Sequence, residues 1–233
     1  MQATLHRYGA REALAEALAA GVAAVLAGGI ATRGAATLAV SGGSTPKLFL
    51  EQLARTGIDW RNVTVTLVDE RWVPETDERS NAAFVRRHLL SGPAAAARFE
   101  TFHVETDTPE EAEAELSARF SRIARPFDAV VLGMGGDGHT ASFLPGADRL
   151  AKAIDPHSRQ AVVAIRGPSA AEPRVTLSLP LLVDARFLAL HIEGEAKMRV
   201  LETAQGPGPV HDLPVRAVLR APRERALEIF WAP

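Results

Sequence analysis

The chain has 233 residues, of which 47% are hydrophobic, so it is long enough to bury a sizeable core. Its formal net charge is −2 and it has no basic tail, which argues against nucleic-acid binding through bulk positive charge. It has no cysteine, which excludes disulfides, thiolate metal sites and a cysteine nucleophile and agrees with a cytoplasmic location.

The first long apolar segment, residues 17–31, consists almost entirely of Ala, Val, Leu, Ile and Gly. A signal peptide is one interpretation, but Glu12 and Glu16 precede the segment at the place where a signal peptide carries positive charge. The segment is also short for a membrane span. We therefore expect a helix from Arg11 to about Leu26 that packs on a sheet and stops at Gly28-Gly29.

Strands and helices alternate along the rest of the chain. Apolar runs predict strands at about residues 4–8, 37–40, 63–68, 99–104, 129–132, 161–165, 175–179, 187–192 and 227–231. Capping residues and amphipathic patterns predict further helices at about residues 46–54, 81–90, 109–124, 197–203 and 213–219. This order predicts an α/β fold with a doubly wound, mostly parallel sheet and helices on both faces. No long linker divides it, so we expect a single domain over residues 1–233.

Four glycines, at positions 133, 135, 136 and 138, follow the expected strand at residues 129–132. They let the backbone turn sharply and approach a ligand. Asp137 and His139 lie among them, at the carboxyl end of a strand, where open α/β sheets bind their ligands. The glycines also fit a dinucleotide motif, but Pro145 comes too soon for the long helix that this motif opens. The remaining alternative is that Asp137 and His139 only tie down a loop.

Two other expected strands end in polar loops, at residues 41–46 and 69–74. In a parallel sheet such ends share one edge. Gly42 and Gly43 precede a helix and can direct N–H groups at an anion, although a plain glycine turn is the alternative. Lys197 opens a helix, where a cation opposes the helix dipole; this favours a ligand-facing role over that of a surface lysine.

Together these loops resemble the 6-phosphogluconolactonase family, in the order in which that family has them. The matching pieces are residues 41–46, 69–74, 80–81, 132–142, 174–180 and 194–197. The resemblance implies a doubly wound, Rossmann-like fold shared with glucosamine-6-phosphate deaminase. It also implies hydrolysis of 6-phosphoglucono-δ-lactone in the oxidative pentose phosphate pathway, with no metal or cofactor in the chemistry.

Glucosamine-6-phosphate deaminase is the closest alternative. It has a similar Gly-x-Asp-Gly-His loop but carries a Glu where this chain has Leu144, which favours the lactonase. A sugar-phosphate sensor without activity is another alternative. Such regulators usually carry a DNA-binding segment ahead of this domain, and we see no room for one before residue 37. Gly136 departs from other lactonases, which can have Pro or another residue there, and we expect little consequence.

The catalytic roles follow from this resemblance and from the chemistry of lactone hydrolysis. His139 is the expected base, because imidazole exchanges protons near neutral pH. Asp137 is expected to orient the ring and to stabilise the imidazolium. Arg71, beside two carboxylates in the sequence, is expected to serve either the oxyanion or the phosphate.

The expected binding residues surround this centre. The substrate phosphate is expected on the backbone of the loop formed by Gly42, Gly43, Ser44 and Thr45. Arg174 and Lys197 are its expected cations, and Asp69 is expected to bind sugar hydroxyls. No set of His, Asp and Glu residues has obvious metal-ligand spacing. We expect a small-molecule substrate, no nucleic-acid or membrane partner, and a cytoplasmic monomer or weak homodimer.

Overall fold

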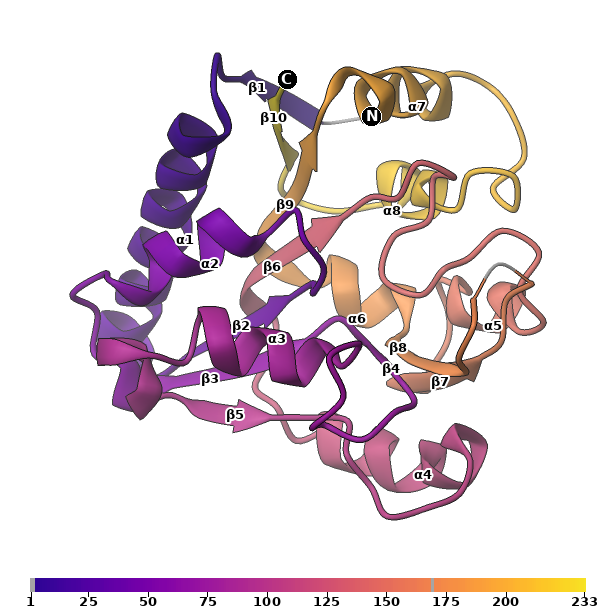
Figure 1. The fold of residues 1–233 in the computed structure, drawn as a ribbon, viewed down its shortest axis with the longest axis horizontal. Coiled ribbons are helices and arrows are strands. Elements are labelled where there is room, and N and C mark those ends of the chain that lie inside the picture. Colours follow the sequence, from indigo (N-terminus) through magenta and orange to yellow (C-terminus); the bar gives the residue numbers. More distant parts are fainter. Residues whose placement is uncertain (1–2, 169) are drawn as a thin grey trace.

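The computed structural model of the protein describes residues 3–168 and 170–233. Its helices are α1 (Arg11–Arg33), α2 (Lys47–Ala54), α3 (Asn81–His88), α4 (Pro109–Phe120), α5 (Leu150–Ala153), α6 (Leu179–Val183), α7 (Glu195–Gln205) and α8 (Val215–Arg220) (Figure 1). Its strands are β1 (Ala3–Arg7), β2 (Ala36–Val40), β3 (Val63–Leu67), β4 (Asp69–Arg71), β5 (Arg98–Glu100), β6 (Phe127–Gly133), β7 (Val162–Ile165), β8 (Arg174–Leu177), β9 (Ala185–Glu193) and β10 (Leu227–Ala232).

The main sheet has seven strands in the order β1-β10-β9-β6-β2-β3-β5, and every neighbouring pair is parallel. The central strands β2 and β6 are buried along almost their whole length, which is why they read in the sequence as continuous apolar runs. In Figure 1, α1 and α2 lie to the left of this sheet and α6 lies to its right. The predicted α/β fold with a mostly parallel sheet is confirmed.

The predicted stop of the first helix at Gly28-Gly29 is wrong, because α1 continues to Arg33. It ends at Gly34, whose φ of 77° gives the left-handed conformation that closes helices. Gly29 instead permits close packing. A Cβ atom there would lie 2.9 Å from Asp128 Oδ1 and 3.1 Å from Ala36 Cβ, so the sheet leaves no room for a side chain.

Among the described helices, α1 is the one that is long and apolar enough to cross a membrane by length and composition alone. Its apolar face is used within the fold. Leu14, Leu18, Val22 and Leu26 are fully buried, and the helix contacts β2, β6, β9 and β10. Packing on the sheet therefore accounts for the hydropathy of α1, as predicted for this segment.

The three strands whose ends were expected to share one edge are β2, β3 and β6, and all three lie in the parallel sheet. The strands β4, β8 and β7 form a second, antiparallel sheet, and β4 lies in the segment that was expected to be a polar loop after β3. The chain leaves the main sheet after Val68, whose N–H donates to Val40 and whose carbonyl accepts from Leu177. Short apolar runs predict a strand but not its partner, so the sequence could not separate the two sheets. The strand expected at residues 99–104 is also shorter, because β5 covers only Arg98–Glu100.

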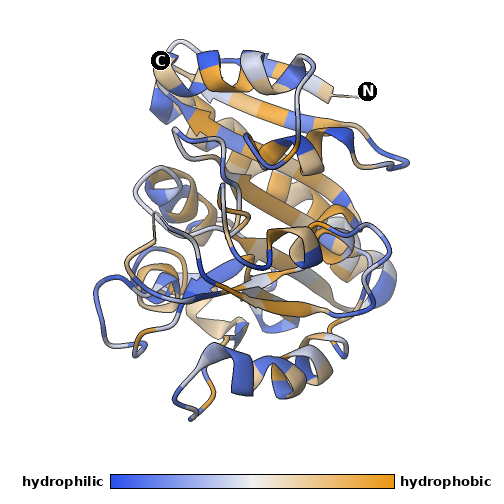
Figure 2. Cartoon of the chain, turned by 90° about the vertical axis from the view of Figure 1, so that its right-hand side faces the viewer, coloured by the Kyte–Doolittle hydropathy of each residue, from blue (hydrophilic) through white to orange (hydrophobic). Residues whose placement is uncertain are grey.

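Hydrophobic residues are concentrated in the strands at the centre of the molecule, and hydrophilic ones in the loops around them (Figure 2). The loops after β2 and β6, the small sheet and the start of α7 come together beyond the carboxyl ends of the central strands. This is the place where open α/β sheets bind ligands.

Candidate active site

A cavity of about 210 Å³ lies at this edge of the sheet. It brings together nine of the predicted site residues, namely Gly42, Gly43, Ser44, Thr45, Asp69, Arg71, His139, Arg174 and Lys197. Its other lining residues are Ser41, Pro46, Asn81, Gly133, Met134, Gly135 and Ala141. The predicted residue outside this lining is Asp137, which reaches the cavity through His139.

His139 and Asp137 form a hydrogen-bonded pair at the rim of the cavity. His139 Nδ1 lies 2.6 Å from Asp137 Oδ1, and the same oxygen accepts the His139 backbone N–H at 3.1 Å. This pairing leaves Nε2 as the ring nitrogen without a partner among the described residues. A carboxylate on one nitrogen and a free second nitrogen are the arrangement of an imidazole that acts as a general base.

The charge of Asp137 is fixed by this pair. The hydrogen bond from His139 is the largest influence, and it holds the pKa of Asp137 at about 2, below its ordinary value of 3.8. The carboxyl therefore stays ionised throughout the neutral range and can stabilise a positive imidazolium.

Because residue 135 is glycine, the His139 ring can lie directly against its backbone. A Cβ atom on Gly135 would lie 2.3 Å from His139 Nδ1 and Cε1 and 2.7 Å from Asp137 Oδ1. Gly138 has a φ of 76°, and a Cβ there would lie 2.6 Å from Leu213 Cδ2, so this position also requires glycine. The glycine-rich sequence thus serves two close approaches, one to the imidazole and one to the segment before α8.

The loop after β2 forms the opposite side of the cavity. Gly43 has a φ of 97°, which turns the chain toward the start of α2. Lys197 reaches this loop from the first turn of α7, and its Nζ donates to Thr45 Oγ1 at 3.2 Å. Burial lowers the pKa of Lys197, and the nearby negative charge of Glu193 opposes this shift.

The small sheet contributes Asp69, Arg71 and Arg174. Asp69 is buried, and its Oδ2 lies 3.8 Å from Arg174 Nη1. Arg71 donates through Nη1 to the carbonyl of Arg79. The Nε atoms of both arginines are buried and have no hydrogen-bond partner in the part of the chain that the structure describes. Two cations and one carboxylate of the small sheet therefore line the cavity at this wall.

Glu70 and Asn81 support this wall, and neither was predicted as a site residue. Glu70 is buried and accepts from the backbone N–H groups of Arg71, Asn81 and Ala82 and from the Ser80 hydroxyl. Burial raises the pKa of Glu70 despite these four donors. The Ser80-Asn81 pair was recognised as a helix start, and Ser80 does cap α3, but no local pattern shows that Glu70 turns inward.

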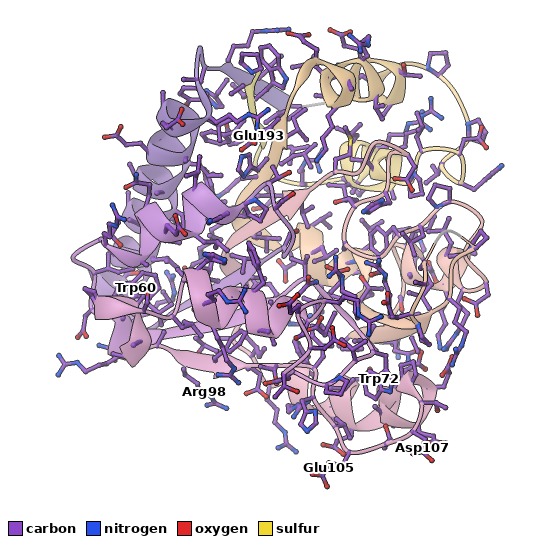
Figure 3. All side chains as sticks on the ribbon, viewed as in Figure 1. Trp60, Trp72, Arg98, Glu105, Asp107 and Glu193 are labelled. Carbon is purple, nitrogen blue, oxygen red and sulfur yellow. The ribbon has the colours of Figure 1, made fainter. Side chains whose placement is uncertain are left out.

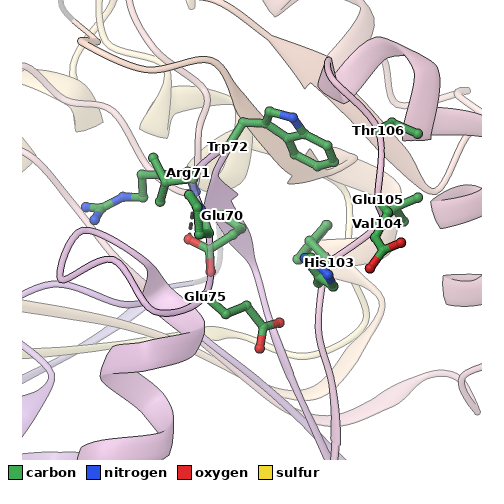
Figure 4. Close-up of a pocket in the computed structure, with 11 residues that line it drawn as sticks. Glu70, Arg71, Trp72, Glu75, His103, Val104, Glu105 and Thr106 are labelled. Atoms are coloured by element: carbon green, nitrogen blue, oxygen red, sulfur yellow. Dashed lines mark hydrogen bonds between the residues drawn. The ribbon is translucent and has the colours of Figure 1, made fainter.

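A second cavity, of about 240 Å³, lies beside the first and shares Arg71 with it. Its walls include Trp72, Phe102, His103 and Glu75 (Figure 4). In that view the Arg71 side chain points away from Trp72 and His103. Trp72 lies on the side of the molecule that also carries Glu105 and Asp107, far from Trp60 (Figure 3). This cavity lacks the glycine loops and the imidazole–carboxylate pair, so it is not the candidate active site.

Within residues 3–168 and 170–233, no three His, Asp or Glu side chains are grouped so that they could hold a metal ion. The polar groups of the cavity are instead those that recognise an anion. Phosphate or an oxyanion can bind to the three cations of the cavity, Lys197, Arg71 and Arg174, and to the backbone of the loop at residues 41–46.

Comparison with known proteins gives consistent similarities. Residues 9–231 match the family model described as glucosamine-6-phosphate isomerases/6-phosphogluconolactonase. The chain is 49% identical over 233 residues to a protein named 6-phosphogluconolactonase from Rhizobium meliloti (strain 1021), with 100% of each chain covered. It is 50% identical over 223 residues to one of the same name from Mesorhizobium japonicum, covering 96% of this chain and 92% of the relative.

Solved structures agree with these similarities in sequence. A crystal structure of a 6-phosphogluconolactonase from Shewanella baltica OS155 superposes with a TM-score of 0.96 at 37% identity. The superposition covers 100% of this chain and 98% of that one. The fold and the order of the cavity-lining loops are therefore those of a known group of proteins.

Proposed function

The chain belongs to the family of glucosamine-6-phosphate isomerases and 6-phosphogluconolactonases, and we propose that it hydrolyses 6-phospho-D-glucono-1,5-lactone to 6-phospho-D-gluconate in the oxidative pentose phosphate pathway. The observation that carries the proposal is the His139–Asp137 pair, at 2.6 Å, on the rim of a cavity lined by three cations. A base beside a phosphate-sized anion site is what a phosphorylated lactone requires.

In this proposal His139 activates the water. Its Nε2 takes a proton from a water molecule as the water oxygen attacks the lactone carbonyl. Asp137, bonded to Nδ1, stabilises the imidazolium that results. The tetrahedral oxyanion then collapses, the bond between the carbonyl carbon and the ring oxygen breaks, and the imidazolium returns the proton to the departing oxygen. The products are a carboxylic acid and a free hydroxyl group.

Cations and backbone N–H groups of the cavity bind the substrate phosphate and stabilise the oxyanion in this proposal. The phosphate binds to Arg174, Lys197 and the backbone of residues 42–45, a set supported by their common place in the cavity. Arg71 stabilises the oxyanion or the phosphate. Each charge-assisted hydrogen bond contributes roughly 1.5–3 kcal/mol. Asp69 accepts a hydrogen bond from a sugar hydroxyl. A location in the cytoplasm and a monomeric or weakly dimeric state are part of the proposal.

The side chain of Leu144 argues against the deaminase reaction. Leu144 is buried, does not line the cavity and packs on Gly167, where a Cβ would lie 2.8 Å from Leu144 Cδ1. A deaminase that opens a sugar ring needs a proton-transferring group near the ring oxygen, and an aliphatic side chain cannot supply it. A lactone is already oxidised at the reacting carbon, so its hydrolysis needs no such group.

The test is to add the protein to freshly made 6-phosphogluconolactone and to follow acid release with a pH indicator. We expect release above the spontaneous rate, in proportion to protein concentration. Release at the spontaneous rate over a range of protein and substrate concentrations would refute the proposed function.

A further inference from the structure

The carboxylate of Asp69 is held by a serine on the same loop as His139. Ser142 Oγ donates to Asp69 Oδ2 at 2.5 Å, and Ser142 is completely buried. Arg174 Nη1 lies 3.8 Å from the same oxygen. Oδ2 thus accepts a hydrogen bond from the Ser142 hydroxyl and lies at ion-pair distance from the Arg174 guanidinium.

The backbone is strained where it brings Ser142 to this place. Ala141, which lines the cavity, has a φ of 47° although it is not glycine. Such a conformation persists only where the surroundings enforce it. A turn closed by the Phe143 N–H and the Thr140 carbonyl surrounds it, and the Ser142 N–H donates to Thr176 Oγ1 at 3.4 Å. The loop adopts an unfavourable backbone conformation where it points the Ser142 hydroxyl at Asp69.

A second contact fixes Asp69 from the other side. Asn81 Nδ2 donates to the backbone carbonyl of Asp69 at 2.9 Å and lies 3.5 Å from Oδ1, at the outer limit of a hydrogen bond. The same Asn81 packs over the cavity loop, because a Cβ on Gly42 would lie 2.1 Å from Asn81 Oδ1. Asp69 is thus held between the loop of the proposed base and the loop proposed to bind phosphate.

We infer that Ser142 is a positioning residue: by donating its hydroxyl to Oδ2 of Asp69, it leaves Oδ1 to accept a hydrogen bond from one substrate hydroxyl. The inference rests on the proposed function. In this role Asp69 recognises one ring hydroxyl of the substrate, and Ser142 orients the carboxylate of Asp69. Ser142 itself does not line the cavity.

The experiment compares the full chain with Ser142→Ala, Ser142→Cys and the control Ser117→Ala. Cysteine fills the space that alanine leaves empty but is a weak donor, so a loss common to both variants does not come from that empty space. Ser117 also makes two hydrogen bonds, to the N–H and the carbonyl of Val162, away from the cavity. The substrates are 6-phosphogluconolactone and its analogues that each lack one ring hydroxyl, and kcat and KM are measured for each.

We expect the kcat/KM of the wild type to be about 10- to 100-fold lower on one of these analogues than on the parent lactone, because that analogue lacks the hydroxyl that makes a charge-assisted hydrogen bond to Asp69. Both Ser142 variants should lose about 10-fold on the parent lactone but less than about twofold on that analogue, because the contact is already absent there. Ser117→Ala should behave like the wild type.

Two results would overturn this role. An equal loss in the Ser142 variants on the parent and on every analogue would show that Ser142 only supports the fold. Unchanged kcat/KM in both variants would show that Asp69 needs no orientation. A wild type that does not turn over the parent lactone would refute the proposed function and this role with it, which separates the two failures.

Discussion

Arg71 and Arg174 lie directly opposite each other on the antiparallel strands β4 and β8, and both line the same cavity. Like charges at opposed positions of a sheet are destabilising. Within residues 3–168 and 170–233 neither Nε atom has a hydrogen-bond partner, although both are buried. Asp69 and the Arg79 carbonyl satisfy only part of this charge. The wall is therefore arranged to receive an anion.

This arrangement predicts how the cations affect substrate binding. Replacing Arg174 or Lys197 by Ala should raise KM for the phosphorylated lactone by about 10- to 100-fold, since each replacement removes a charge-assisted bond that we propose to the phosphate. The unphosphorylated lactone should be a poor substrate of the wild type and should lose little more in the variants. Steady-state kinetics on the two lactones measures this difference.

The control for this prediction is Lys152→Ala, which removes an exposed lysine that contacts Glu113 outside the cavity. It should leave both KM values unchanged. Equal losses on both lactones in the Arg174 or Lys197 variant would mean that these residues hold the fold instead of the phosphate.

Gly135 and Gly136 form a matched pair for testing the place of the imidazole. A Cβ on Gly135 would lie 2.3 Å from the His139 ring, whereas one on Gly136 meets nothing within 4 Å. Gly135→Ala should therefore displace the ring and lower kcat by about 10²-fold or more, and Gly136→Ala should have nearly wild-type kcat. Turnover by the two variants, with circular dichroism to confirm folding, provides the comparison. Similar kinetics for both would contradict the geometry described for His139.

The pKa of Asp137 predicts a pH dependence. Because this pKa is held at about 2, the carboxylate is charged from about pH 4 upward, so no loss of kcat/KM above pH 4 comes from protonation of Asp137. In Asp137→Asn the ring of His139 loses its charged partner, so kcat measured between about pH 5 and pH 8 should fall by roughly 10- to 100-fold.

The lowered pKa of Asp137 also makes the stability of the fold depend on pH. A depressed carboxyl pKa contributes stability above the unfolded value of 3.8, and that contribution disappears as the pH falls toward about 2. The wild type should therefore lose its stability advantage over Asp137→Asn between about pH 4 and pH 2. Urea unfolding at several pH values tests this, and a constant difference down to pH 2 would contradict it.

The sequence predicted most elements of the main sheet, because buried parallel strands and capped helices leave strong local patterns. It also named nine residues that line the cavity, from the glycines and charged residues near the ends and starts of expected elements and from the resemblance to a known family. Gly28-Gly29 misled the prediction because a glycine that ends a helix and a glycine that packs against a sheet look alike in sequence. Only the contact of Gly29 with Asp128 and Ala36 distinguishes them.

Local patterns could not show that the small sheet is separate from the main one. They also could not assign Glu70, Asn81 and Ser142 to the site. Each depends on contacts between segments distant in the chain. Ser142 meets Asp69 across 73 positions, and the strand pairing of β4 with β8 joins Arg71 to Arg174. Local periodicity carries no information on such partners.

The presence of Leu144 leads to the prediction that glucosamine 6-phosphate is not a substrate. The protein should release no ammonia from glucosamine 6-phosphate, because the buried Leu144 offers no group for proton transfer to a ring oxygen. An ammonia assay run beside the lactone assay tests this. Ammonia release at a rate comparable to lactone hydrolysis would contradict the assignment.

The hydrolysis should also be insensitive to a chelator, because His139 and water are proposed to suffice for it. Activity is measured after incubation with EDTA and dialysis, and again after addition of Mg²⁺ or Zn²⁺. Loss of activity that a divalent ion restores would leave the substrate assignment standing but would refute the metal-free mechanism.

The central claim is that His139 is the base, and the most direct measurement is the turnover of freshly made 6-phosphogluconolactone by His139→Ala. The exposed His103 serves as the control, as His103→Ala, because it lines only the second cavity. We expect kcat of His139→Ala to fall by about 10²- to 10⁴-fold with folding and 6-phosphogluconate binding largely retained, and His103→Ala to match the wild type. Wild-type turnover in a folded His139→Ala protein would contradict the account.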